Sequence, residues 1–153
     1  MKSFAILFLG LLLGASALAT PPEATAVIEH AVLWKAPHDE TTWLPTALAK
    51  LVEEPGLFTQ EGNFYMPNEE IRAFGHKVAY VGLLGIELYP GPNVTLEGRV
   101  DAVRAAIEKA YSIKLKKVEG GFDAELQKNV HLLITQHPSN RKQTMVIGAY
   151  LGE

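Results

Sequence analysis

The stretch VAYVGLLGIELYPGPNVTLEG, residues 78–98, decides how we expect the chain to fold. Residues 78–89 make up the longest apolar run after the N-terminus, and apolar side chains fill most of both sets of alternating positions. This pattern predicts a strand that is covered on both faces. The turn-forming residues 90–93 come next, so residues 94–97 are expected to return beside the strand. We therefore expect the fold to be organised around a sheet.

Segments on either side of this stretch carry the patterns of helices and further strands. Helices are expected at residues 23–35, 42–52, 67–74 and 99–111, although β-branched residues in the first segment leave a strand possible there. Strands are expected at residues 62–66, 113–118, 122–127, 130–134 and 142–151. Short turns between successive strands favour antiparallel pairing. The sequence thus predicts an α+β domain, a mostly antiparallel sheet with helices packed on one face.

The first nineteen residues have the three parts of a cleaved signal peptide. Lys2 supplies the positive charge, residues 5–13 the apolar segment, and Ala17-Leu18-Ala19 the small residues of a cleavage site. The apolar segment is shorter than the roughly 20 residues of a membrane span, so we expect cleavage rather than an uncleaved anchor. The predicted organisation is a signal peptide at 1–19 and one α+β domain at 20–153.

The composition limits which cellular compartment and which classes of partner we expect for this protein. The chain has no cysteine, which excludes disulfides and favours a bacterial periplasmic or secreted protein, since small secreted domains elsewhere often carry disulfides. Removing residues 1–19, which hold one lysine and no acid, changes the formal net charge from −3 to −4. A mildly acidic domain argues against a nucleic-acid partner. No later segment is long and apolar enough for a membrane span, so we expect a soluble mature protein.

Few side chains in this sequence offer catalytic chemistry. After cleavage the only serines are Ser112 and Ser139, and neither lies in a G-x-S-x-G motif. The histidines lack the i,i+4 or i,i+2 spacing that points two rings at one metal ion, and they are His30, His38, His76, His131 and His137. We therefore expect no catalytic set of these kinds, no metal site and no cofactor.

The positive cue for function is the turn itself. Two prolines fix their own φ angles and a glycine lies between them, so the loop is expected to keep one shape and to bind with a small loss of entropy. The predicted binding residues are Tyr89, Pro90, Gly91, Pro92 and Asn93. The same turn could instead only set the register of the strands.

These observations favour an exported, non-catalytic envelope or secreted module that binds a protein or a small ligand. The alternative is a small periplasmic enzyme that uses dispersed Glu and His residues as acid and base, with Glu87 and His76 as the candidates. Glu87 is a lone carboxylate in the most apolar strand. It is expected either at a sheet edge that faces water or in a buried position with a raised pKa.

Overall fold

The computed structural model describes residues 20–85 and 89–152 of the chain. Three helices lie in this part: α1 (Pro21–Val32), α2 (Thr46–Val52) and α3 (Val100–Tyr111). Its strands are β1 (Phe58–Glu61), β2 (Phe64–Pro67), β3 (Arg72–Ala73), β4 (His76–Gly82), β5 (Asn93–Glu97), β6 (Lys116–Val118), β7 (Gly121–Gln127), β8 (Val130–Gln136) and β9 (Gln143–Tyr150). The predicted signal peptide and Glu87 lie outside the described residues. None of the described helices is long and apolar enough to cross a membrane.

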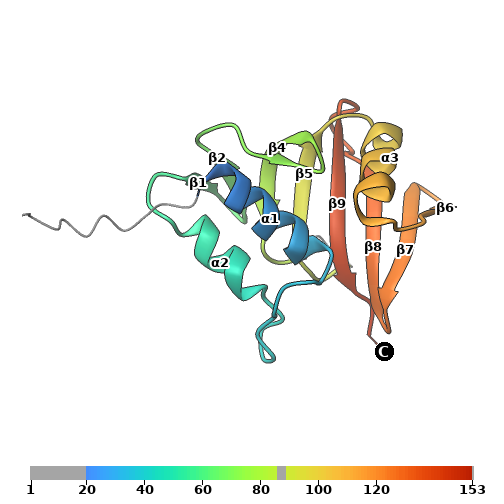
Figure 1. Ribbon diagram of the computed structural model, residues 1–153, viewed down its shortest axis with the longest axis horizontal. Helices are drawn as coiled ribbons and strands as arrows, with labels where there is room; N and C mark the ends of the chain where they lie inside the picture. Colours follow the sequence, from blue (N-terminus) through green and yellow to red (C-terminus); the bar gives the residue numbers. More distant parts are fainter. Residues whose placement is uncertain (1–19, 86–88, 153) are drawn as a thin grey trace, which may run out of the picture.

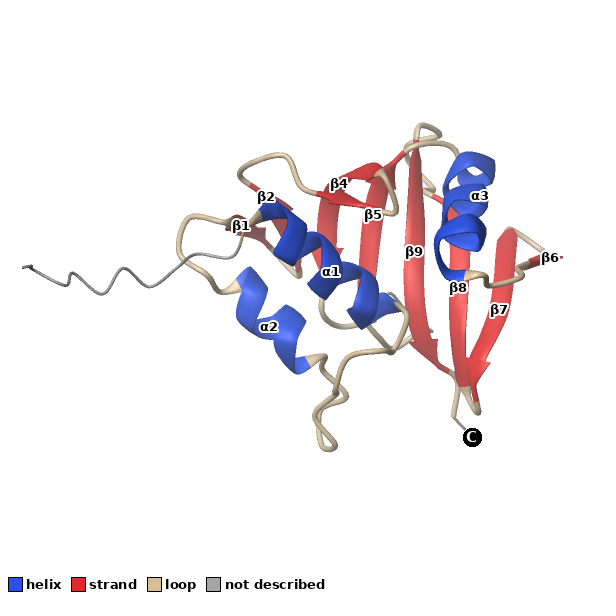
Figure 2. Cartoon of the chain, viewed as in Figure 1, coloured by secondary structure: helices blue, strands red, loops and turns tan. Residues whose placement is uncertain are grey.

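The strands form one open sheet in the order β1-β2-β4-β5-β9-β8-β7-β6, and β3 pairs with β4 beside this path (Figure 1). The strand pairs within the described residues are antiparallel. Helix α3 makes the long connection from β5 to the edge strand β6, and β9 returns to pair with β5. The predicted α+β class with a mostly antiparallel sheet is therefore confirmed (Figure 2).

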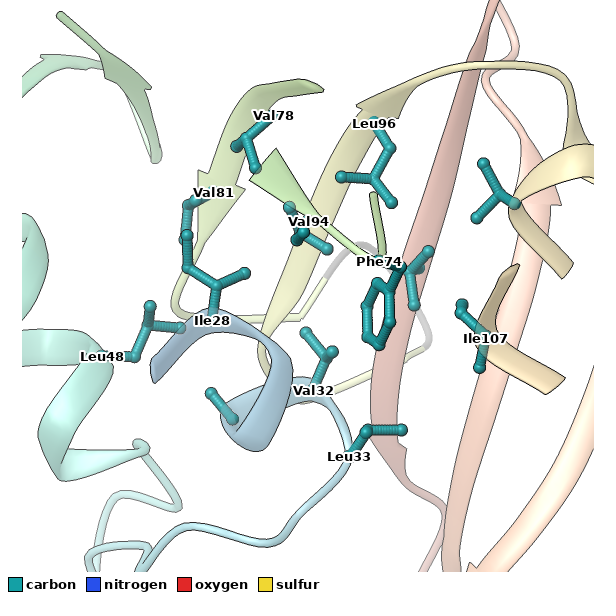
Figure 3. Packing of buried hydrophobic residues seen from close by; sticks show 14 of the residues in the cluster. Ile28, Val32, Leu33, Leu48, Phe74, Val78, Val81, Val94, Leu96 and Ile107 are labelled. Atoms are coloured by element: carbon teal, nitrogen blue, oxygen red, sulfur yellow. The ribbon is translucent and has the colours of Figure 1, made fainter. Parts of the chain in front are cut away.

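One face of the sheet and the helices share a hydrophobic core. Figure 1 shows α1 in front of β4 and β5, and α3 in front of β8. A row of directly opposed apolar residues runs across five strands beneath them: Val81, Val94, Val146, Ile134 and Phe122. Ile28 of α1, Leu48 of α2 and Ile107 of α3 are fully buried in the same cluster (Figure 3). Burial of each such side chain contributes about 1.5–3 kcal/mol, so this layer supplies most of the stability.

Helix α1 packs on the sheet at a glycine of strand β9, where no side chain separates the helix from the strand. Gly148 is on the helix side of β9, two residues after Val146, and a Cβ added there would lie 2.3 Å from the carbonyl oxygen of Val32. The last turn of α1 thus packs directly on the backbone of β9. Any larger residue at position 148 would push the end of the helix away.

The expected helix at 67–74 is absent, because contacts from distant residues hold this segment in another shape. Strand β2 ends at Pro67, and β3 occupies Arg72 and Ala73. Phe74 has a φ of 52° and its backbone N–H donates to Glu29 Oε1 of α1 at 2.6 Å. Local sequence signals for a helix cannot reveal a partner that lies 45 residues away.

The long strand expected from residue 78 is shorter than predicted, because β4 ends at Gly82. The side chain of Asn93 fills the space beside this glycine, at 2.6 Å from the position of an added Cβ. The Asn93 amide then donates to the carbonyl oxygen of Leu84 at 2.9 Å. Strand β4 therefore ends at Gly82, and the carbonyl oxygens of Pro90 and Pro92 already accept hydrogen bonds from β9 before β5 begins at Asn93.

Replacing Gly148 by alanine should lower the free energy of unfolding by about 1–3 kcal/mol, because the added methyl group collides with α1. Urea titration followed by circular dichroism measures this change. Lys116→Ala, at an exposed position of β6, is the control and should stay within about 0.5 kcal/mol. Equal stability of the Gly148→Ala and control variants would contradict the tight contact between α1 and β9.

Candidate binding site

Four ring side chains gather at the end of α1, and we call Trp34, His38, Trp43 and Tyr150 the aromatic cluster. The Trp34 and His38 rings stack with centroids 3.9 Å apart and planes 10° from parallel. Trp43 and Tyr150 form a second stacked pair at 4.9 Å and 14°. The two pairs meet with Trp34 at 6.4 Å from Trp43 and 6.2 Å from Tyr150, distances at which aromatic rings attract one another.

Trp34 enters the cluster from an unusual helix end. The bonds Lys35 N–H to His30 carbonyl (2.8 Å) and Trp34 N–H to Ala31 carbonyl (3.1 Å) form a Schellman motif. In that motif the residue with positive φ is usually glycine, but here it is Trp34 with φ 54°. The left-handed conformation costs a non-glycine residue roughly 1–2 kcal/mol. In return the indole Nε1–H donates to the carbonyl oxygen of Gly148 at 2.9 Å and links α1 to β9.

Trp43 is held by a loop that folds on itself between His38 and Pro45, which face each other as an isolated β-bridge. The Asp39 carboxylate accepts hydrogen bonds from the N–H groups of Thr41 (3.0 Å) and Thr42 (2.7 Å). The Thr42 hydroxyl group donates to the same carboxylate, and the three bonds together hold the pKa of Asp39 below its usual value. The helix expected at residues 42–52 is shorter than predicted, because Thr42 belongs to this loop and α2 begins only at Thr46.

Among the residues of the aromatic cluster, Trp43 is the one that packing stabilises least. Its φ is 59°, and 49% of its surface is exposed. Its indole N–H makes no hydrogen bond to another of the described residues, unlike that of Trp34. A bulky residue in this backbone conformation is a true outlier, and such outliers concentrate at functional sites. The strain keeps a large aromatic ring at the surface.

A cavity of about 170 Å³ opens between the aromatic cluster and the loop after β4. Its walls are Trp34, Trp43 and Tyr150 on one side, and residues 83–85 with Pro90 and Gly91 on the other. No charged side chain is found among the described residues of the lining. This volume is below the range of about 300–1,000 Å³ for drug-sized ligands, so it suits one ring or one apolar side chain.

The predicted binding residues 90–92 run beside the end of β9 instead of forming a free turn. The carbonyl oxygen of Pro92 accepts from the N–H of Gly148 at 2.9 Å, and that of Pro90 accepts from the N–H of Tyr150 at 2.8 Å. Gly91 has a φ of 143°, and an added Cβ would lie 1.9 Å from the Gly148 carbonyl oxygen. Pro90 and Gly91 line the cavity of the cluster, while Pro92 is buried.

The two outer residues of the prediction lie elsewhere. Asn93 is only 1% exposed, and its amide is engaged with the carbonyl oxygen of Leu84. Tyr89 is 43% exposed and borders a shallow cavity of about 120 Å³ beside Leu133 and Thr135. The structure thus brings two of the five residues to the aromatic cavity and places Asn93 where it holds the loop.

The residues expected for the enzyme alternative do not form a described site. His76 Nδ1 lies 3.1 Å from the carbonyl oxygen of Glu97, and His76 does not line the aromatic cavity or the cavity beside Tyr89, while Glu87 lies outside the described residues. A different pair does meet, since His131 Nδ1 is 2.9 Å from Asp123 Oδ1 at a cavity of about 540 Å³. Among residues 20–85 and 89–152, no group of three or more His, Asp or Glu could hold a metal ion.

Comparison with family models, with curated proteins and with solved structures finds no match for this chain. Function must therefore be argued from the site and not by analogy with a fold. No pattern in the sequence joins Tyr150 to Trp43, because 107 positions separate them. The only available hint was that both tryptophans of the chain lie within ten residues of each other.

Stability should depend on the protonation of His38 in the cluster. The Ala36 carbonyl, 2.8 Å away, can only accept, so Nδ1 carries the proton and Nε2 is left buried without a partner. Burial lowers the pKa of His38 below its usual 6.5, and the bond to Ala36 opposes this in part. The unfolded chain therefore binds the proton first as pH falls. The stabilisation is present above about pH 6.5 and is lost as pH falls through the lower folded-state pKa.

Urea unfolding at about pH 7.5 and about pH 5.5 measures this effect. The free energy of unfolding should fall more for the wild-type chain than for His38→Gln, which has no proton to take up. His30→Gln, at an exposed position of α1, is the control and should retain the wild-type loss. An identical loss in His38→Gln and the wild type would contradict a neutral, buried His38.

Proposed function

We propose that this chain is an exported, non-catalytic module that binds a protein or a small ligand, and that the aromatic cluster is its binding surface. The observation that carries the proposal is the pair of tryptophans in left-handed backbone conformation. Trp34 has a structural use, because its indole joins α1 to β9. Trp43 has no comparable use and stays half exposed. Retention of a strained, exposed indole is explained by contact with a partner, since tryptophan and tyrosine dominate binding energy at interfaces.

The cavity beside the cluster limits what is bound there. Its small volume, its ring-rich wall and the lack of charged side chains among its described residues favour an uncharged apolar group, either one ring of a small ligand or one apolar side chain of a protein. Pro90 and Gly91 supply the opposite wall, and Pro92 and Asn93 hold that wall in place. A wall whose backbone is bonded to β9 loses little entropy on binding.

Export is the second part of the proposal and is supported by the first described residues. Cleavage before Thr20 would keep the whole of α1, which begins at Pro21. The Thr20 nitrogen donates to Glu23 Oε2 at 2.6 Å. Cleavage would make this nitrogen a charged α-amino group, and a hydrogen bond between charged partners is shorter and stronger than a neutral one. A bacterial periplasmic or extracellular location fits a chain without cysteine.

Mass spectrometry of the protein made in its own host should find an N-terminus at Thr20. The reason is the small-residue site at Ala17-Leu18-Ala19. A retained Met1, or a cut within α1, would contradict the predicted export.

Substitution of Trp43 by alanine should remove the anchor of the binding surface and leave the fold intact. The mature domain is immobilised and used to capture partners from the envelope fraction of its host, and each captured species is then titrated against the free domain. We expect Trp43→Ala to weaken binding by about 2 kcal/mol or more, roughly 30-fold, with little change in melting temperature. Because both tryptophans belong to the cluster, tryptophan emission should also shift on binding to the wild-type domain.

Val118→Ala, which trims a 43% exposed residue of the edge strand β6, is the matched control and should keep wild-type affinity. Equal affinity of Trp43→Ala and the control would contradict the aromatic cluster as the binding surface. Loss of affinity in His131→Gln alone would instead place the binding surface at the cavity where His131 lies 2.9 Å from Asp123.

A further inference from the structure

We propose a second binding site on the face of the sheet that is turned away from the helices, for a small neutral molecule with a planar apolar body and a carbonyl group. A cavity of about 370 Å³ opens there. Its volume lies within the usual range of small-molecule sites, unlike that of the aromatic cavity. This proposal does not depend on the function proposed above, since none of its residues belongs to the aromatic cluster.

The floor of this cavity is one row of directly opposed residues on three neighbouring strands. Tyr80 of β4 faces Thr95 of β5, and Thr95 faces Met145 of β9. The β2 residue Phe64 forms a side wall, with its ring 6.3 Å from that of Tyr80 at an angle of 61°. Phe64 is 39% exposed although it is a large apolar residue. Two rings and a thioether beside open space make a surface that suits a planar apolar group.

The rim is the loop that joins β8 to β9, and its own hydrogen bonds fix its shape. The N–H of His137 donates to the carbonyl oxygen of Gln143 at 2.9 Å, and the N–H of Gln143 donates to that of Asn140 at 3.0 Å. The Asn140 side-chain oxygen also accepts from the N–H of Lys142 at 3.0 Å. A rim that is ordered before binding adds little entropic cost when a ligand enters.

The same loop sets which ring nitrogen of His137 can serve a ligand. The backbone N–H of Ser139 donates to His137 Nδ1 at 3.2 Å. In neutral histidine the accepting nitrogen carries no proton, so the proton is assigned to Nε2. His137 lines the cavity, and its Nε2–H makes no hydrogen bond to any described residue. It is therefore a donor available for a carbonyl oxygen.

Two further polar side chains of the cavity have no bond within the described chain. Thr95 is only 4% exposed, yet its hydroxyl group makes no hydrogen bond to another described residue. The amide of Gln143 likewise has no described side-chain bond. The Thr95 hydroxyl oxygen is not among the fully buried atoms that lack a partner in the described chain, so it is open to the cavity. A ligand with one polar end would satisfy them together with His137.

The charges of the side chains that line this cavity indicate whether its ligand is neutral or ionic. The described residues of the lining include no carboxylate, lysine or arginine, so they offer no full opposite charge to an ion. Placing an unpaired charge among apolar side chains carries a large desolvation penalty. The geometry therefore favours a neutral molecule over an anion or cation of the same shape.

Benzamide, benzoate and benzamidine provide a test, because they are planar, have nearly the same size and differ in charge. Each is titrated to about 10 mM into the uniformly ¹⁵N-labelled domain, since small fragments bind with dissociation constants near the millimolar range. We expect benzamide to shift the amide signals of Thr95, Gln143 and Met145, with an affinity at least threefold higher than that of either ion. Phe64→Ala and Thr95→Val should each weaken benzamide binding about threefold or more, whereas Val118→Ala should not.

Each other result would overturn the proposal. Equal binding of benzoate or benzamidine would contradict a neutral ligand class. Shifts confined to the indole signals of Trp34 and Trp43 would place the small-molecule site in the aromatic cluster, as would unchanged affinity in both Phe64→Ala and Thr95→Val. If benzamide shifts no signal at the highest concentration, the proposed site does not exist. The amide spectrum of each variant shows directly whether it is folded, so a loss of binding cannot be mistaken for unfolding.

Discussion

The contact between the last turn of α1 and the backbone of Gly148 is the constraint on which the rest of the structure depends. Because Gly148 has no side chain, Val32 approaches β9 closely, and the Trp34 indole reaches the Gly148 carbonyl oxygen. The same glycine donates its N–H to Pro92 and lies against Gly91 on the other side. One position thus fixes the helix, an aromatic ring and the loop before β5. The aromatic cavity exists because all three meet there.

Backbone strain in this fold is compensated to different degrees at different residues. Phe74 has a positive φ, but it is 4% exposed and its N–H is bonded to Glu29, which also accepts from the Tyr111 hydroxyl of α3. Trp34 regains stability through its bond to β9. Trp43 gains ring stacking with Tyr150 and a bond from its backbone N–H to the carbonyl oxygen of Asp39 at 2.8 Å, but its indole N–H has no partner among the described residues. The positive-φ residue whose side chain stays half exposed is the one that favours a function outside the folding of the chain itself.

The sequence predicts the elements whose residues pack by simple periodicity. The helix around Ile107 and the strands of residues 122–134 have one apolar face each, and the structure has them within a few residues of the expected bounds. Prediction fails where distant residues decide the local shape. Glu29 holds Phe74 outside a helix, and the Asn93 side chain beside Gly82 ends a strand that its apolar residues would continue. The aromatic cluster is missed for the same reason, because Tyr150 reaches it only through the register of β9.

That register also explains how one strand supplies residues to both proposed sites. Strand β9 is bonded to β5 on one side and to β8 on the other, which makes it a firm support in the middle of the sheet. Alternate side chains of a strand point to opposite faces. Gly148 and Tyr150 therefore belong to the helix side, and Gln143 and Met145 belong to the open side. A slip of one residue would exchange these sets, so the buried row that fixes the register of β9 also fixes both sites.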